Sequence, residues 1–176
     1  MDHLIDACRI KRFMFFEKKV FKEIAEDPNA FLQGSTLFLG LLVWRSLSDY
    51  GPKVLGGIAH SDYWFTYVSW FFERFFWTGV GLIIYLIITV GIVHALARIM
   101  GGKASLTGYF SASSYSSLPQ FLMIIPFIGN IFLPVSLIYL VVTVKRVYEI
   151  SVWKAMTILL ASGIAVVSLL ELFHLS

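Results

Sequence analysis

The sequence has little cysteine and little charge. Cys8 is the only cysteine in 176 residues, which excludes a disulfide framework and a thiolate metal cluster. Charged residues make up 14% of the chain, against about a quarter in soluble domains. The histidines at positions 3, 60, 94 and 174 lack metal-ligand spacing, and no HExxH motif or serine nucleophile elbow is present. The sequence therefore predicts no metal, no cofactor and no enzymatic activity.

Apolar residues are abundant instead. They make up 58% of the chain, and the mean hydropathy is +0.79. A small soluble particle has too little interior to bury this much apolar surface, whereas lipid can solvate it. The net charge of +3 does not indicate a nucleic-acid partner, because the basic residues gather at the N-terminus and beside apolar runs. We predict an all-α, polytopic membrane protein.

Five apolar stretches approach the length that crosses a hydrocarbon core of roughly 30 Å. Asp27-Pro28 predicts the start of the first, since Asp is a good N-cap and Pro fits the first helical turn, and Gly51-Pro52 predicts its end. Gly56-Gly57 indicates a loop, and the aromatic-rich stretch 63–77 is typical of an interfacial belt. A cytoplasmic segment, residues 1–27, precedes a bundle at residues 28–176, with spans at about 28–47, 79–100, 109–127, 131–147 and 152–173.

Residues 9–26 have the period of an amphipathic helix. Apolar side chains fall on one face and basic side chains on the other. Such a helix can lie in the membrane interface on the cytoplasmic leaflet, which is the interpretation we favour. The alternative is a helix packed on the cytoplasmic face of the bundle itself. The apolar face consists of Ile10, Phe13, Met14, Val20, Phe21 and Ile24.

The basic residues also predict the orientation. With the N-terminus in the cytoplasm, eleven Lys and Arg residues lie on the cytoplasmic side and three, Arg45, Lys53 and Arg74, on the other. Cytoplasmic loops carry the excess of positive charge in membrane proteins. We therefore expect a multi-pass protein of the cell membrane, with its N-terminus inside and its C-terminus outside.

Two stretches of the chain resemble the Yip domain family, membrane proteins named for binding Ypt/Rab GTPases. They are HALARIMGGKASLTGYFSASSYSSLP (His94–Pro119) and KRVYEISVWKA (Lys145–Ala155), and EIAEDP before the first span is similar to the prokaryotic or archaeal branch. The resemblance covers roughly residues 23–172. It implies five spans, a cytoplasmic N-terminus and, from the eukaryotic members, a role in vesicle budding and in Golgi and endoplasmic-reticulum membrane organisation. Those members carry a longer N-terminal region that engages GTPases, so the 27 residues here argue against GTPase binding.

The predicted spans contain few polar residues that could carry chemistry. His94 and Arg98 lie one helical turn apart and could move a proton or bind an anionic headgroup. Alternatively, His94 locks the third span by bonding a serine or the carbonyl of Tyr115, which Pro119 would free from its helical bond. We favour this structural role. Ser113 and Ser117 belong to a serine-rich face that suits close helix packing inside the bundle.

Five basic residues are expected at the cytoplasmic surface, where anionic lipid headgroups are the natural ligand: Arg98, Lys103, Lys145, Arg146 and Lys154. The alternative is that they only orient the protein. Gly101-Gly102, with Lys103 and Ser105 after it, could form an anion-binding nest, but a helix-ending glycine pair is the favoured interpretation.

These features predict a non-enzymatic membrane scaffold that organises membranes through lipid and protein contacts. The expected partners are membrane lipids and either a second copy of the chain or another membrane protein. A small transporter or channel is the alternative, because interrupted helices such as the Pro- and Ser-rich third span often line binding sites. A polar cavity around His94, Ser113 and Ser117 would favour transport, and a solid core there would favour the scaffold.

Overall fold

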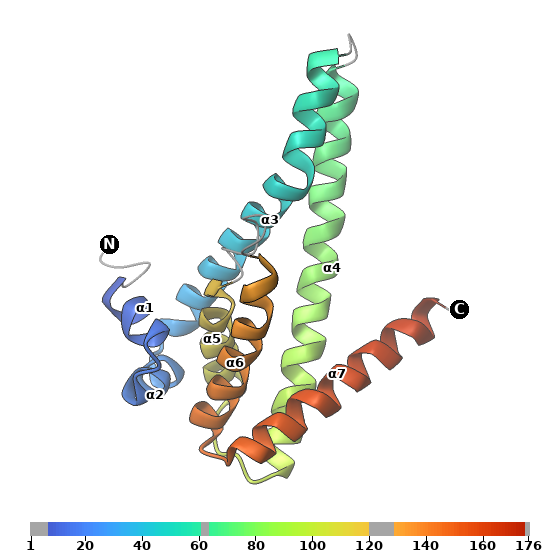
Figure 1. The fold of residues 1–176 in the computed structure, drawn as a ribbon. Helices are drawn as coiled ribbons and strands as arrows, with labels where there is room; N and C mark the ends of the chain where they lie inside the picture. Colours follow the sequence, from blue (N-terminus) through green and yellow to red (C-terminus); the bar gives the residue numbers. More distant parts are fainter. Residues whose placement is uncertain (1–6, 61–63, 120–128, 175–176) are drawn as a thin grey trace.

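The described part of the chain is entirely helical. The computed structural model describes residues 7–60, 64–119 and 129–174, and within these ranges it contains seven α-helices and no strand, which confirms the all-α class (Figure 1). In chain order they are α1 (Ala7–Met14), α2 (Lys18–Glu26), α3 (Ala30–His60), α4 (Trp64–Ile99), α5 (Leu106–Ser116), α6 (Gly129–Tyr148) and α7 (Val152–His174).

Helix α5 lies in the middle of the helix packing. It contacts α2, α3, α4 and α6, while α7 contacts α4 and α6. Figure 1 shows α1 and α2 flanking the α5–α6 pair, α3 and α4 continuing together as a long hairpin, and α7 diverging towards the C-terminus. The prediction that the serine-rich helix sits inside the bundle is therefore confirmed.

Small residues allow this central position. A Cβ atom on Gly34 of α3 would lie 3.2 Å from both Ser111 Cα and Ser114 Cβ of α5. One turn earlier in α5, a Cβ on Gly108 would lie 2.5 Å from the carbonyl oxygen of Ala25 in α2. Larger side chains at these crossings would force the backbones apart, so the Gly and Ser residues bring α2, α3 and α5 close together.

Two of the described helices are long and apolar enough to cross a membrane. They are α4 and the segment Val152–Leu169 of α7, and a third is possible if α2 and α3, which meet at 104°, form one broken span. At 1.5 Å per residue the 36-residue α4 is about 54 Å long, well beyond a hydrocarbon core of roughly 30 Å. The spans predicted at 131–147 and 152–173 fall inside α6 and α7, and the one predicted at 79–100 falls inside α4 except for its last residue, Met100.

The first predicted span has different ends in the structure. Helix α3 begins at Ala30, and Asp27 Oδ1 accepts the Asn29 backbone N–H at 2.8 Å instead of capping a helix that starts at Pro28. The prediction that Gly51-Pro52 ends this helix is wrong, because α3 continues through Pro52 to His60. Residues 50–60 are therefore helical, not a loop.

Packing of α3 against α4 explains this continuation. The rings of Tyr50 and Trp70 meet edge to face with centroids 5.6 Å apart, and the hydroxyls of Tyr50 and Thr78 are 3.2 Å apart. Further along, Gly57 lies so close to the ring of Tyr67 that a Cβ there would overlap it. Contacts on both sides of Pro52 thus hold the α3–α4 hairpin together despite the missing backbone donor.

The N-terminal segment forms two helices, not one. Phe16 has a φ of +56° between α1 and α2, which breaks the helix predicted over residues 9–26. The apolar face is buried in protein: Phe13, Val20, Phe21 and Ile24 are all fully buried. The ring of Phe13 lies 5.6 Å from Tyr115 and 5.9 Å from Tyr139. The structure therefore supports packing on the bundle and not the interfacial helix that the sequence favoured.

The third predicted span, 109–127, is described only in its first part. Helix α5 ends at Ser116, and the Ser117 N–H donates to the carbonyl of Ser114 at 3.3 Å. Pro119 lies after this end, because a proline disfavours the helical conformation at the residue before it. The prediction of a proline inside the helix is wrong, and residues 120–127 of the predicted span lie outside the described ranges.

Candidate functional site

Tyr148, the last residue of α6, connects three helices. It is fully buried, and its hydroxyl lies 2.7 Å from Nδ1 of His94 in α4. The ring centroids of Tyr148 and His94 are 5.8 Å apart, and those of Tyr148 and Tyr109 in α5 are 5.2 Å apart. This cluster, His94, Tyr109 and Tyr148, joins α4, α5 and α6.

His94 has a different partner from the ones expected. The sequence predicted a serine or the carbonyl of Tyr115, whereas the structure pairs His94 with the phenol of Tyr148. The bond holds α6 against α4, so it does not lock the third span directly. Arg98, one turn later, donates from Nη1 to the carbonyl of Gly102 at 3.3 Å. His94 and Arg98 thus have separate protein partners.

Gly101 and Gly102 end α4. Gly101 has a φ of +94°, its N–H donates to the Arg98 carbonyl at 3.1 Å, and the Gly102 N–H donates to the Ala97 carbonyl at 2.8 Å. These two bonds define a Schellman C-terminal motif. The interpretation as a helix-ending pair is confirmed, and these two N–H groups are not available to form an anion nest.

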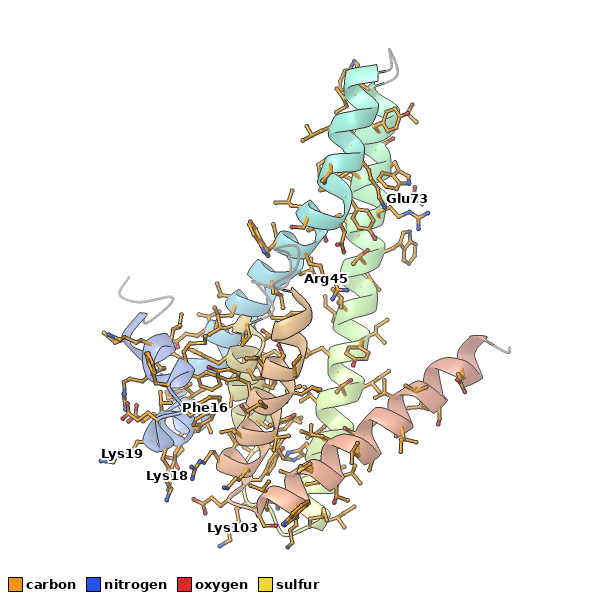
Figure 2. All side chains as sticks on the ribbon, viewed as in Figure 1. Phe16, Lys18, Lys19, Arg45, Glu73 and Lys103 are labelled. Atoms are coloured by element: carbon orange, nitrogen blue, oxygen red, sulfur yellow. The ribbon has the colours of Figure 1, made fainter. Side chains whose placement is uncertain are left out.

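The predicted basic residues lie at one end of the molecule. The C-termini of α4 and α6 and the N-terminus of α7 meet there, and Figure 2 shows Lys103 at this end. Lys154 of α7 donates from Nζ to the carbonyl of Met100 at 3.0 Å. Lys154 and Arg98 therefore both donate to backbone carbonyls at the C-terminal end of α4, where a positive charge is favourable. Lys145 and Arg146 are half-buried in the last turn of α6, and the Arg146 Nε is buried with no hydrogen-bond partner among the described residues.

A second polar cluster, which the sequence did not reveal, lies between the N-terminal helices and the bundle. The buried hydroxyl of Tyr115 donates to Oε1 of Gln33 at 2.7 Å. Arg9 Nη1 donates to the same oxygen at 3.1 Å and to Oδ2 of Asp27 at 2.5 Å. This cluster, Arg9, Asp27, Gln33 and Tyr115, ties α1 to α3 and α5. The signal that could have revealed it is Gln33, a glutamine near the start of an apolar span.

The ion pair in this cluster is electrostatically favourable. Burial by itself would raise the pKa of Asp27, but hydrogen bonds from Arg9 and from the Asn29 backbone outweigh it and hold that pKa below its ordinary value. The carboxylate of Asp27 therefore stays ionised at neutral pH and keeps its bond to Arg9.

The serines of α5 face a cleft and bond to their own helix. The cleft, of about 480 Å³, lies between α3, α4 and α5, and Ser113 and Ser117 line it, while His94 does not. Ser113 donates to the carbonyl of Phe110 at 2.8 Å and Ser117 to that of Ser114 at 2.6 Å. Its lining also includes the polar residues Arg45, Tyr85, Thr89, Tyr109, Ser114 and Ser116. No group of three or more His, Cys, Asp or Glu residues in the described ranges could hold a metal ion.

The helices and these clusters define a helical membrane protein in which the His94–Tyr148 and Tyr115–Gln33 bonds join helix to helix. The model of the Yip1 domain matches residues 11–173, which is nearly the whole chain, so the chain belongs to the Yip1 domain family. Members of this family are generally non-enzymatic. No curated protein and no solved structure shows significant similarity to the chain.

The two stretches that carry the family resemblance meet in space. His94 and Gly102 come from the first stretch, and Tyr148 and Lys154 from the second. The bonds from Tyr148 to His94 and from Lys154 to Met100 join them. Residues 54 positions apart thus form one contact region where α4, α6 and α7 meet.

Proposed function

We propose that this chain is a non-enzymatic membrane-organising scaffold of the Yip type, which acts through contacts with lipids and with other membrane proteins or a second copy of itself. The observation that carries the proposal is that the four polar residues singled out within the predicted spans are engaged within the protein. His94 bonds Tyr148, Tyr115 bonds Gln33, and Ser113 and Ser117 bond carbonyls of α5. The bonds of His94 and Tyr115 join helices, and the serine bonds satisfy the hydroxyls within α5, so these polar groups stabilise the helix packing that a scaffold requires.

The proposal includes five spans with the N-terminus in the cytoplasm. In support, Lys18, Lys19 and Lys103 lie at one end of the molecule in Figure 2, whereas Arg45 and Glu73 lie farther along the α3–α4 hairpin. Single cysteines placed at Lys103 and Lys53 in a Cys8→Ser background test it. A membrane-impermeant maleimide added to intact cells should label the cysteine at 53 and not the one at 103. The reverse pattern contradicts the orientation.

Anionic headgroups are the proposed ligand of the basic end. Lys103 is exposed and Lys145 is half-buried there. Replacing both with Gln should weaken the binding of anionic lipid. Each charge removed should cost about 1 kcal/mol of binding free energy, which is about fivefold in affinity. Lys53→Gln is the matched control, because Lys53 is an exposed lysine on the distal hairpin. Equal loss in the control would show that these lysines act only through net charge.

A transporter remains the second candidate, and one observation favours it. The serine-lined cleft includes Thr89, whose buried Oγ1 has no hydrogen-bond partner among the described residues, and Arg45 lies on its wall. The Thr89→Val variant in liposomes separates the two functions, because Thr89 lines the cleft and its hydroxyl has no partner among the described residues. A folded variant that loses a measured solute flux supports transport, whereas a folded variant with unchanged behaviour supports the scaffold.

A further inference from the structure

A long apolar groove follows the seam of three helices. It has a volume of about 490 Å³, within the range of roughly 300–1,000 Å³ that is usual for small-molecule sites. Phe31 and Phe38 line it from α3, Ile87 and Gly91 from α4, and Phe110 from α5. Its α4 wall belongs to the helix that is apolar and long enough to cross a membrane. In a membrane this groove would therefore be in contact with lipid acyl chains.

One end of the groove is polar. A second cleft, of about 460 Å³, shares Phe31 and Thr107 with the groove, so the two adjoin. Its walls are the α2–α3 turn, with Glu26 and Asp27, and the first turn of α5, with Ser105 and Ser111. An apolar groove that adjoins a polar cleft matches a phospholipid, whose acyl chain is apolar and whose headgroup is polar.

The first turn of α5 supplies donors to this polar cleft. Ser105 caps the helix, since its Oγ accepts the Gly108 N–H at 3.0 Å. The N–H groups of Leu106 and Thr107, the first two of the helix, have no intrahelical acceptor. Together with the hydroxyl of Thr107 and the positive end of the helix dipole, they suit a phosphate group.

The charge of the cleft selects the rest of the headgroup. Its charged lining residues in the described ranges are the acids Glu26 and Asp27. Asp27 is bonded to Arg9, whereas the ion pair of Glu26 within the described part of the chain is an exposed, distant one with Lys22 at 3.7 Å. A headgroup with a second negative charge would meet repulsion here, and a primary ammonium group would find an acceptor.

We propose that this groove binds one phospholipid with an amine-bearing, zwitterionic headgroup. One acyl chain occupies the groove between α3, α4 and α5, the phosphate binds at the first turn of α5, and the ammonium group pairs with Glu26. The site rests on the proposed membrane-scaffold function and names a lipid for it. None of its lining residues is one of the five basic residues for which anionic lipid is proposed, so each proposal can fail without the other.

Two glycines of α4 allow a matched test of the groove. A Cβ added at Gly91 or at Gly81 would meet no heavy atom within 4 Å, so both positions accept a larger side chain. Gly91 lines the groove, and Gly81 lines neither cleft. Native mass spectrometry of protein purified in mild detergent measures the lipid that stays bound. We expect Gly91→Phe to lower the retained phospholipid about tenfold, equivalent to about 1.4 kcal/mol, and Gly81→Phe to leave it unchanged. Equal retention in both variants, or equal loss, overturns the proposal.

The headgroup is tested by competition. In nanodiscs that contain equal amounts of phosphatidylethanolamine and phosphatidylglycerol, the wild type should retain the former on extraction. Glu26→Gln should abolish this preference, and Glu73→Gln, on the distal hairpin, should preserve it. Preferential retention of phosphatidylglycerol by the wild type overturns the amine assignment.

A measurement on the unaltered protein covers the case in which Gly91→Phe does not fold. A phospholipid with a photoreactive acyl chain should crosslink to residues of the groove, such as Phe31, Ile87 and Phe110. Crosslinks spread evenly over the exposed face of α7, for example at Leu160 and Ile164, would show general lipid contact only and contradict a built site. If the protein were a dimer, carried no lipid and gave no crosslinks in the groove, the groove would be assigned to a second copy of the chain instead.

Discussion

The ring of Tyr148 packs directly on Gly102, and a methyl group on that glycine would lie 2.7 Å from Tyr148 Cδ1. The same methyl group would lie 2.9 Å from the carbonyl oxygen of Ala97, which is backbone and cannot swing away. Gly102 therefore both ends α4 and makes room for the aromatic ring that bonds His94.

Gly102→Ala should destabilise the protein by about 1–3 kcal/mol, because the added methyl group overpacks this contact. Thermal unfolding in detergent measures the effect. Gly163→Ala in α7 is the control, since a Cβ there meets nothing within 4 Å. It should be neutral or stabilising by up to about 1 kcal/mol from helix propensity. Equal stability of the two variants would contradict the tight contact at Gly102.

Tyr148→Phe keeps the ring and removes the hydroxyl that pairs with His94. We expect a loss of about 1 kcal/mol of unfolding free energy, since hydrogen bonds between membrane helices contribute about this much. Chemical unfolding in mixed micelles provides the measurement. Tyr85→Phe, on the exposed face of α4, should change little. If Tyr148→Phe were as stable as the wild type, the bond to His94 would not stabilise the fold.

Phe13→Ala tests whether the N-terminal helices pack on the bundle. Phe13 is fully buried, whereas Phe15 is 76% exposed. Truncating a buried phenylalanine costs about 3–5 kcal/mol, so Phe13→Ala should release α1 and expose it to protease. Phe15→Ala should leave the cleavage rate unchanged. If both substitutions accelerated cleavage to a similar extent, and added lipid vesicles restored protection, the result would instead support a helix lying in the membrane interface.

The contact between α1 and α2 should weaken in acid. Arg12 binds the carboxylates of Glu17 and Glu23 at 2.8 Å, and these hydrogen bonds lower the pKa of both glutamates. A lowered pKa in the folded state contributes stability above the ordinary value of about 4.3, and this contribution is lost as the pH falls through the lowered values. The protection of residues 7–26 against hydrogen exchange, measured relative to the intrinsic rate at each pH, should therefore fall below about pH 4.3.

Arg12→Gln is the matched variant for this pH dependence. Without the guanidinium, the exchange rate of residues 7–26 should already be high at pH 7, and the additional acid effect should disappear. An unchanged acid response in Arg12→Gln would assign the effect to other carboxylates, with Asp27, which pairs with Arg9, as the next to test.

Some of the fold could be read directly from the chain. The spans at 79–100 and 152–173 were predictable because long apolar runs have one favourable environment, and they fall in α4 and α7. The glycine pair at 101–102 was also readable, since a positive φ after a helix is a local preference of glycine. These features depend on neighbouring residues only.

Other features depend on distant residues and were not readable. Pro52 looked like a helix end because its local effect is to break helices, but contacts of α3 with α4 on both sides of it keep the helix intact. The break at Phe16 was hidden because the apolar period continues across it. Burial of Phe13 against Tyr115 and Tyr139 then decided where the N-terminal helices lie.

By itself the sequence determined that this protein is helical, that it belongs in lipid, and which few polar residues lie within its apolar segments. Composition and local periodicity suffice for this, because the solvation of apolar side chains is a property of each segment. Only the tertiary structure decided that His94 pairs with Tyr148 and Tyr115 with Gln33. Those partners lie 54 and 82 positions apart, and a hydrogen bond forms between whichever donor and acceptor the packing of helices brings within about 3 Å.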